Sequence, residues 1–314
     1  TMDKIKSIFF AASEIAIPCL EQLIAIEQNQ LVGIVTQPGR AKGRGQKYSL
    51  NPIAEWAERH HIPYFPAQTM DDEAYAWLQN KQADLMFVMS FGRILKRRFL
   101  DLAALGMWNF HTSLLPKYRG ASPIQTCLYE GEAYTGVTLM KMVEALDAGP
   151  WIDQAQLAID KRDTAASLTV KLADLTADVL KKNFDALVHG RYQLHTQDEG
   201  AVTLTHKFCK ADGLLAFNAS ADQLERRIRA FNPWPGTFFQ IDDVCIKVHA
   251  AHVADGASDE TPGTLLLGEN GHALGVKCSK GILMIDQLQY PGGKILDAKT
   301  FLNGHRKLFS GQLH

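Results

Sequence analysis

The first 190 residues alternate short apolar runs with segments of helical periodicity, and this alternation constrains the fold more than any other feature of the sequence. Strands that alternate with helices are typical of βα units, which build a mostly parallel sheet with helices on both faces. A long helical segment then ends at Gly190, a residue that favours helix termination. We therefore predict a doubly wound α/β domain over residues 1–190. The apolar runs are IKSIFFA, LVGIVT, IPYFP, ADLMFVMSF, GMWNFH, TGVTLMKM and PWIDQAQLAI.

The pattern changes after Gly190. Residues 191–208 are mostly polar and show little helical periodicity, which indicates a linker. Residues 209–314 contain one capped helical segment, SADQLERRIRAF, followed by short alternating strands with Gly and Asp turns. We expect a small C-terminal β-barrel domain there, similar to an OB fold.

Composition narrows the classes of function. The chain has 314 residues, a net charge of -1 and a pI of about 6.8, so it has no general basic field and any nucleic-acid contact must be local. Five scattered cysteines without CxxC spacing argue against disulfides and zinc, and we predict no metal. No apolar stretch reaches the roughly 18 residues of a membrane span. We expect a cytoplasmic monomer that contacts no membrane.

Asn109 and His111 lie at the end of the apolar run GMWNFH. Residues two apart in a strand share one face, and ligands of open α/β sheets bind near the carboxyl ends of the strands. An Asn amide and a His imidazole together suit oxyanion stabilisation and proton transfer. The alternative is structural, with Asn109 in a turn and His111 packed at the strand end.

Asp147 follows the next strand, in the turn LDAGP. From a neighbouring loop its carboxylate could reach His111 and orient the imidazole ring. The alternative is an Asx-turn in which Asp147 holds only its own backbone.

Two loops complete the candidate site. In SLLPKYRGASP, Pro116 and Gly120 indicate an irregular loop that can approach a ligand. The segment Thr36 to Pro52 carries four basic residues among three glycines, which suits phosphate contacts or is a solvated loop. The chain lacks the GxGxxG, Walker A, GxSxG and HExxH signatures. The basic residues are Arg40, Lys42, Arg44 and Lys47.

Asn109, His111, the SLLP segment and Asp147, taken in order, resemble the folate-dependent formyltransferase superfamily. Within it, TQPGRAKGRGQK, FHTSLLPKYRGASPIQ, TGVTLMKMVEALDAG and RRIRAFNPWPGTFF are most similar to motifs of the methionyl-tRNA formyltransferase family. The resemblance spans nearly the whole chain. It implies that the first domain is a formyltransferase-like Rossmann variant.

The resemblance also implies substrates and site residues. The formyl donor would be 10-formyltetrahydrofolate, the acceptor the α-amino group of methionyl initiator tRNA, and no metal would take part. Asn109 and His111 would stabilise the oxyanion, while His111 and Asp147 would handle the amine proton. The folate-binding candidates are Phe91, Gly92, Ser113, Leu114, Leu115 and Pro116. The tRNA-binding candidates are Arg40, Lys42, Arg44, Lys47, Lys207 and Lys210.

Other activities remain open at this stage. The acceptor could be a nucleotide-sugar amine or a purine precursor, although the purine enzyme resembles only the first domain. A hydrolase that passes the formyl group to water is a second alternative, and a catalytically silent tRNA-binding module is a third. The basic loop disfavours the hydrolase, and the presence of Asn109, His111 and Asp147 disfavours the silent module.

Overall fold

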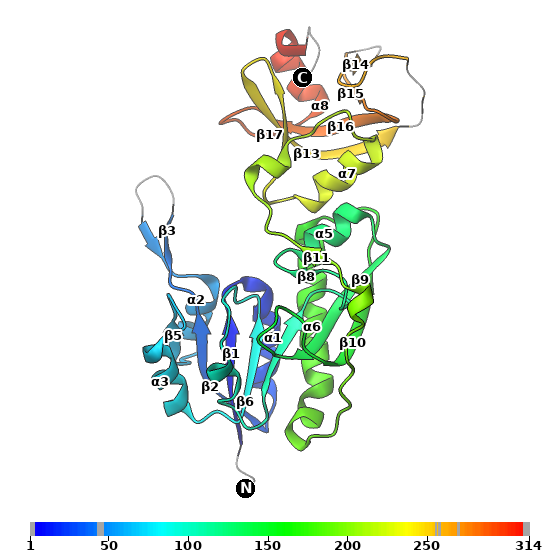
Figure 1. The fold of residues 1–314 in the computed structure, drawn as a ribbon. Helices are drawn as coiled ribbons and strands as arrows, with labels where there is room; N and C mark the ends of the chain where they lie inside the picture. Colours follow the sequence, from blue (N-terminus) through cyan, green and yellow to red (C-terminus); the bar gives the residue numbers. More distant parts are fainter. Residues whose placement is uncertain (1–3, 43–46, 255, 257–258, 269–270, 310–314) are drawn as a thin grey trace. The chain divides into compact units, whose positions relative to one another are not determined.

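A computed structural model describes residues 4–42, 47–254, 256, 259–268 and 271–309, without the side chains of residues 40–48. The chain divides into two compact units (Figure 1). Unit 1 comprises Thr1–Pro123, Tyr134–Ala158 and Thr169–Thr205, and unit 2 comprises Ile124–Ala133, Ile159–Leu168 and His206–His314. Because the two units interleave along the chain, the domain boundaries that we placed at residues 190 and 209 stay predictions.

Unit 1 is built on a seven-stranded sheet in the order β10-β9-β7-β6-β1-β2-β5. Strands β7, β6, β1, β2 and β5 are parallel. Strand β9 pairs with β7 in antiparallel orientation, and β10 pairs antiparallel with β9, so β10 runs in the same direction as β7. The predicted mostly parallel α/β sheet is therefore confirmed. The strands are β1 Ile5–Ala11, β2 Asn29–Thr36, β5 Tyr64–Pro66, β6 Leu85–Met89, β7 Met107–His111, β9 Tyr134–Lys141 and β10 Trp151–Ala158.

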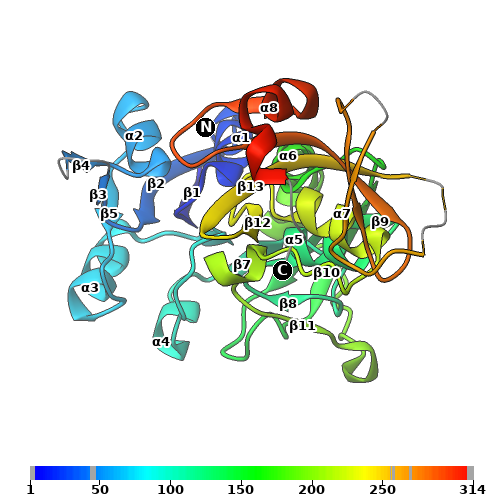
Figure 2. The same ribbon diagram turned by 90° about the horizontal axis from the view of Figure 1, so that it is seen from above.

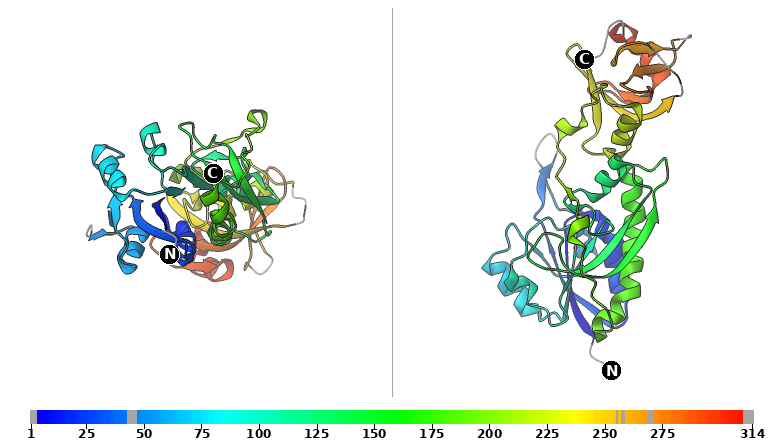
Figure 3. Two further views of the ribbon diagram at one scale, coloured as in Figure 1. Left: turned by 90° about the horizontal axis from the view of Figure 1, so that it is seen from below. Right: turned by 45° about the vertical axis from the view of Figure 1, so that its right-hand side comes forward.

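Helices cover both faces of this sheet, as Figure 2 shows. One face packs Ile8 and Phe10 of β1 against Leu78 of α3 and Phe99 of α4 in a single apolar cluster. Helices α1, α2 and α6 lie on the other side, and α6 runs beside the sheet in the right panel of Figure 3. The helices are α1 Ile17–Ala25, α2 Pro52–Arg59, α3 Asp72–Lys81, α4 Arg97–Leu100 and α6 Ala165–His189, with a 3-10 turn η1 at Glu14–Ala16.

Two small sheets extend from unit 1. The basic segment forms a hairpin of β3 (Arg40–Lys42) and β4 (Lys47–Ser49). Its base is closed by Asn51, whose side chain donates to the Gln37 carbonyl and accepts hydrogen bonds from the Thr36 hydroxyl and the first amides of α2. The second sheet pairs β8 (Arg119–Gly120) with β11 (Leu204–Thr205) in parallel, after a 3-10 turn η2 at Glu199–Ala201.

Unit 2 contains a six-stranded antiparallel sheet in the order β12-β13-β16-β15-β14, with β17 also paired to β16. Helix α7 packs on β13 and β16, and α8 on β16 and β17. The separate C-terminal β domain, which we predicted as a small β-barrel, is thus an antiparallel sheet covered by two helices. Its elements are η3 Lys210–Gly213, α7 Ala221–Ala230, β12 Thr237–Ile241, β13 Val244–Ala254, β14 Leu265–Leu267, β15 Leu274–Lys277, β16 Ile282–Gln289, β17 Ile295–Asp297, α8 Ala298–His305 and η4 Arg306–Phe309.

Most of helix α5 (Pro123–Glu130) belongs to unit 2, although it precedes the last strands of unit 1 in the chain. The Arg227 guanidinium of α7 lies 5.3 Å from the centre of the Tyr129 ring, and its Nη2 donates a 3.0 Å hydrogen bond to the Tyr129 hydroxyl. Phe231 stacks on the same ring. An early part of the sequence therefore packs against α7 within the C-terminal unit.

Candidate active site

Strand β7 places Asn109 and His111 on one face of the sheet, as the spacing predicts. Both are nearly buried, with exposed fractions of 8% and 6%. Among the described residues, the Asn109 amide has no side-chain hydrogen-bond partner. Buried amides are usually bonded, so this N–H donor is available to a ligand.

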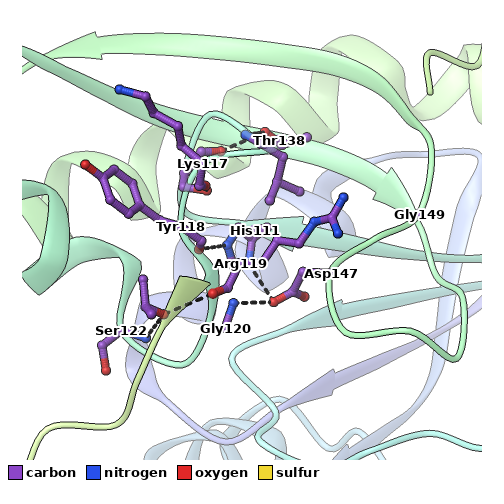
Figure 4. A network of polar contacts seen from close by, with 12 residues as sticks. His111, Lys117, Tyr118, Arg119, Gly120, Ser122, Thr138, Asp147 and Gly149 are labelled. Carbon is purple, nitrogen blue, oxygen red and sulfur yellow. Dashed lines mark hydrogen bonds and ion pairs between the residues drawn. The ribbon is translucent and has the colours of Figure 1, made fainter. Parts of the chain in front are cut away.

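The His111 ring is held by a backbone carbonyl (Figure 4). Its Nε2 lies 2.8 Å from the Tyr118 oxygen. Because a carbonyl can only accept, Nε2 must carry a hydrogen, and Nδ1 is the nitrogen left for chemistry. Tyr118 has a positive φ of 63°, which is uncommon for a non-glycine residue.

Asp147 approaches the free nitrogen of His111. Its Oδ2 lies 3.6 Å from His111 Nδ1 and accepts a 2.8 Å hydrogen bond from the Gly120 amide. Its other oxygen, Oδ1, has no partner among the residues that the structure describes. The carboxylate is thus anchored through one oxygen, while the second can accept a proton from a bound molecule.

Two glycines permit this arrangement. Gly120 has a φ of 114°, and a Cβ there would lie 2.7 Å from the Thr205 carbonyl oxygen. A Cβ on Gly149 would lie 1.8 Å from the Lys141 oxygen. Backbone contacts this close exclude any side chain. Both glycines are therefore needed to fold the Asp147 turn and its anchor onto the sheet.

His111 and Asp147 thus meet from two separate parts of the chain, and Asn109 lies on the same face of β7 as His111. Together they offer a free N–H donor on Asn109, an imidazole fixed at Nε2, and a carboxylate with one free oxygen. A donor and a proton acceptor near one point suit a reaction that passes through a tetrahedral oxyanion.

The SLLP loop is fixed by buried hydrogen bonds. The Thr138 hydroxyl donates to the Ser113 carbonyl at 2.7 Å and accepts from the Leu115 amide at 3.1 Å. Gln154 Nε2 donates to the Leu115 carbonyl at 2.7 Å. Ser113 and Leu115 are buried, whereas Leu114 and Pro116 are partly exposed and can contact a ligand.

Phe91 and Gly92 lie just beyond β6, but the Phe91 ring is part of the core. It is 2% exposed and meets the Phe10 ring edge-on at 5.5 Å. The Phe91 carbonyl accepts a 2.8 Å hydrogen bond from Gln37 Nε2. Any ligand contact in this turn would come from its backbone and not from the phenyl ring.

The basic candidates lie apart from this cluster in the sequence. Arg40 and Lys42 are on β3 and Lys47 is on β4, with side chains outside the described residues. Arg44 also lies outside them. Lys207 and Lys210 belong to unit 2 and are exposed.

The sequence analysis missed Gln197 and the role of Arg119. Gln197 Nε2 donates 2.8 Å hydrogen bonds to the carbonyls of Asp147 and Gly149. Its Oε1 accepts from the Arg119 guanidinium at 2.9 and 3.0 Å. These hydrogen bonds join residues that are 48 to 78 positions apart in the sequence. Gln197 lies in the polar segment 191–208, which we predicted to be a linker, and nothing in that segment alone indicates such distant partners.

Arg119 also reaches the surface. Arg119 Nη2 donates a 2.7 Å hydrogen bond to Glu199 Oε1. This hydrogen bond lowers the pKa of the Glu199 carboxyl from its usual value. Because Glu199 is largely exposed, we assign little stability to this pair. The Arg119–Gln197 contact, in contrast, is buried.

Within the described part of the chain, no three His, Cys, Asp or Glu side chains gather closely enough to hold a metal ion. None of its helices combines the length and the apolar character that crossing a bilayer requires.

Comparison with known proteins gives matches over nearly the whole chain. The family model described as formyl transferase matches residues 5–183, and the model of the formyl transferase C-terminal domain matches residues 207–306. A methionyl-tRNA formyltransferase of Legionella pneumophila is 36% identical over 313 residues, 99% of each chain. One from Stutzerimonas stutzeri is 38% identical over 98% of this chain and 96% of its own.

Solved structures share the fold at lower identity. An N-formyltransferase of Helicobacter canadensis, in complex with folinic acid and dTDP-3-aminofucose, superposes with a TM-score of 0.64 at 21% identity, covering 90% of this chain and 98% of its own. HypX of Aquifex aeolicus in complex with tetrahydrofolic acid gives 0.62 at 13% identity, covering 99% and 48%. The chain belongs to the formyl transferase family, and the full-length relatives that it resembles at 36 and 38% identity are methionyl-tRNA formyltransferases.

Proposed function

We propose that this enzyme transfers a formyl group from 10-formyltetrahydrofolate to the α-amino group of methionyl initiator tRNA. The observation that carries the proposal is the 3.6 Å approach of the Asp147 carboxylate to His111 Nδ1, with the unpartnered Asn109 amide on the same face of β7 as His111. Relatives named for this activity match both units of the chain and support the choice of acceptor.

The reaction begins when the amine nitrogen attacks the formyl carbon. The carbonyl oxygen then becomes an oxyanion, which the Asn109 N–H stabilises, joined by Nδ1–H when the imidazole holds a second proton. The amine loses one proton to Asp147 Oδ1 or to the His111–Asp147 pair. When the carbon–nitrogen bond to the folate breaks, N10 gains one proton, so the pair passes on one proton per turnover.

We place the folate against the SLLP loop and the turn after β6. Leu114 and Pro116 are partly exposed and offer apolar contacts, while Ser113 and Leu115 hold the loop in place. The backbone of Phe91 and Gly92 would contact the folate from the turn after β6. A positive φ of 70° at Gly92 gives that turn a shape that glycine adopts readily.

We assign the tRNA contacts to the basic hairpin and to unit 2. Arg40, Lys42, Arg44 and Lys47 lie on or between strands β3 and β4, and positive charge suits a phosphate backbone. Lys207 and Lys210 would add contacts from unit 2, where they are exposed.

A nucleotide-sugar amine is the main competing acceptor. The Helicobacter canadensis structure shares the fold at 21% identity, a level that does not transfer its acceptor to this chain. The full-length relatives at 36 and 38% identity are named methionyl-tRNA formyltransferases, and we therefore favour methionyl-tRNA as the acceptor.

One assay decides between these acceptors. Purified enzyme is incubated with 10-formyltetrahydrofolate and, in parallel, with methionyl initiator tRNA, free methionine, an amino-sugar nucleotide or water alone. We expect formylmethionyl-tRNA as the main product. A formylated sugar nucleotide, or formate released at the same rate without tRNA, would overturn the proposal. The cytoplasmic location and monomeric state expected from the sequence stay predictions.

A further inference from the structure

We propose that Gln197 is a positioning residue, which holds the Asp147 turn so that the carboxylate faces His111. The inference rests on the proposed function. It concerns a residue that touches no reacting atom and acts through the backbone of the catalytic turn.

The Asp147 backbone requires such support. Its φ is 48°, in the left-handed region that non-glycine residues rarely adopt unless surrounding contacts hold them there. The two N–H groups of Gln197 supply these contacts, because they bond the carbonyls of Asp147 and Gly149, both at 2.8 Å. The turn is thereby fixed at the acidic residue and at the glycine that ends it.

Gln197 is itself held in place. It is 5% exposed, and its Oε1 accepts two hydrogen bonds from the buried Arg119 guanidinium. An Arg can only donate, so this contact fixes which end of the amide points toward the Asp147 turn. Arg119 is followed directly by Gly120, whose N–H bonds the Asp147 carboxylate at 2.8 Å. Two neighbouring residues of β8 thus control both the backbone and the side chain of Asp147.

The segment that carries Gln197 is also pinned beside the turn. His195 and Trp151 exchange two backbone hydrogen bonds of 2.8 and 3.0 Å, and their rings stack with centroids 4.4 Å apart. Trp151 begins β10, two residues after Gly149. The contacts at His195 therefore hold Gln197, two residues further along, close to the Asp147 turn.

The test compares turnover in matched variants of the full-length enzyme. Gln197→Met removes the amide at similar volume, and Gln197→Glu keeps the acceptor for Arg119 but loses the N–H donors at neutral pH. We expect each to lower kcat about tenfold or more while KM for the folate changes little, since misplacing a catalytic group by about 1 Å has effects of this order. Wild-type kcat in either folded variant would overturn the proposal.

A control separates positioning from general stability. Asn183 of α6 also donates two hydrogen bonds in unit 1, to Asp153 Oδ2 at 2.6 Å and to the Val179 carbonyl at 2.8 Å, and the second is buried. Asn183→Leu should lower the melting temperature but leave kcat unchanged. Equal losses of kcat in Asn183→Leu and Gln197→Met would show that Gln197 serves stability alone.

A double-mutant cycle tests the route through Asp147. In an Asp147→Asn background, Gln197→Met should have little further effect on kcat, because the group that it positions has already lost its function. Additive effects would refute the proposal. The wild-type enzyme is first assayed with every acceptor, and the variants are compared on the one that it formylates. A failure of the tRNA assignment is thus distinguished from a failure of the positioning role.

Discussion

The two units differ most in what they bury. Unit 1 encloses polar side chains beside its sheet, among them Asn109, His111, Arg119, Thr138 and Gln197. The core cluster of unit 2 consists of apolar side chains and one cysteine, packed between an antiparallel sheet and the helices α7 and α8. Both units are compact, but most of the buried polar side chains among the described residues belong to unit 1, whereas unit 2 buries Asp163 and Thr237.

This difference in buried side chains suggests which substitutions affect catalysis and which affect folding stability. Burying a polar group is unfavourable unless it finds a partner, so a cluster of such groups indicates selection for something other than packing. Apolar burial has no such requirement and stabilises in proportion to the area covered. We therefore expect substitutions of the polar side chains around Asp147 in unit 1 to act mainly on turnover, and those in the core of unit 2 mainly on stability.

The largest effect should come from the core of unit 2. Phe301 of α8 is fully buried, and Phe301→Ala should lower the free energy of unfolding by about 3–5 kcal/mol, through lost burial and the cavity left behind. Denaturant titration followed by circular dichroism measures this loss. Lys299→Ala, at an exposed position of the same helix, should change stability by less than about 0.5 kcal/mol. A loss below about 1 kcal/mol in Phe301→Ala would contradict the packing described for unit 2.

The next largest effect concerns the proposed oxyanion donors. Asn109→Ala and His111→Ala should each lower kcat by about 10² to 10³, the loss typical of removing one such donor. Affinity for the folate should change little, because the donors act mainly in the transition state. Steady-state kinetics and folate titration measure both quantities. Unaltered turnover in both variants would contradict a catalytic site formed by Asn109 and His111.

Charge removal on the basic hairpin should have a smaller effect. Arg44→Gln with Lys47→Gln should weaken tRNA binding and reduce the slope of log K against log salt by about 0.7–0.9 for each lost phosphate contact. Filter binding at several salt concentrations gives this slope. The exposed Lys181→Gln variant of α6 is the control and should leave the slope unchanged. Equal weakening of tRNA and folate would argue against a tRNA role.

The smallest effect is expected at two exposed helix caps, one in each unit. Hydrogen bonds lower the pKa of both carboxyls, chiefly from the Thr69 side chain at Asp71 and from the Thr300 amide at Asp297. A lowered folded-state pKa means that each contribution to stability is complete above the ordinary carboxyl pKa and is lost as pH falls through the lowered value. Asp71→Asn and Asp297→Asn should therefore reduce the fall in melting temperature between about pH 6 and about pH 3. Unequal changes would show that the units differ at their surfaces as well as in their cores.

Much of unit 1 could be predicted from the sequence. Each of the seven expected apolar runs contains a strand of the sheet. Such strands are predictable because apolar periodicity and β-branched residues can be recognised within a few neighbouring positions. Helix α8 was missed because its sequence AKTFLNGH includes an Asn-Gly pair, which indicates a turn. Burial of Phe301 and Leu302 against the sheet overrides that local preference.

The candidate site was predictable only in part. The alternation of β7 placed Asn109 beside His111, and the turn after β9 brought Asp147 toward them. Gln197 could not be found in this way, because its hydrogen bonds connect it to Arg119 and to two carbonyls distant in the chain. Hydrogen bonds between residues far apart in the chain produce no repeating pattern from which they could be predicted.

The place of helix α5 limits how this protein can be divided. A fragment that stops before His206 would retain Tyr129 but lack Arg227 and Phe231, and would present an unpaired aromatic ring to water. A chimaera that exchanged only residues 206–314 would join a foreign α7 to the original α5. Gene fusions, truncations and shuffled libraries of this enzyme should therefore carry residues 124–133 and 159–168 together with the C-terminal segment.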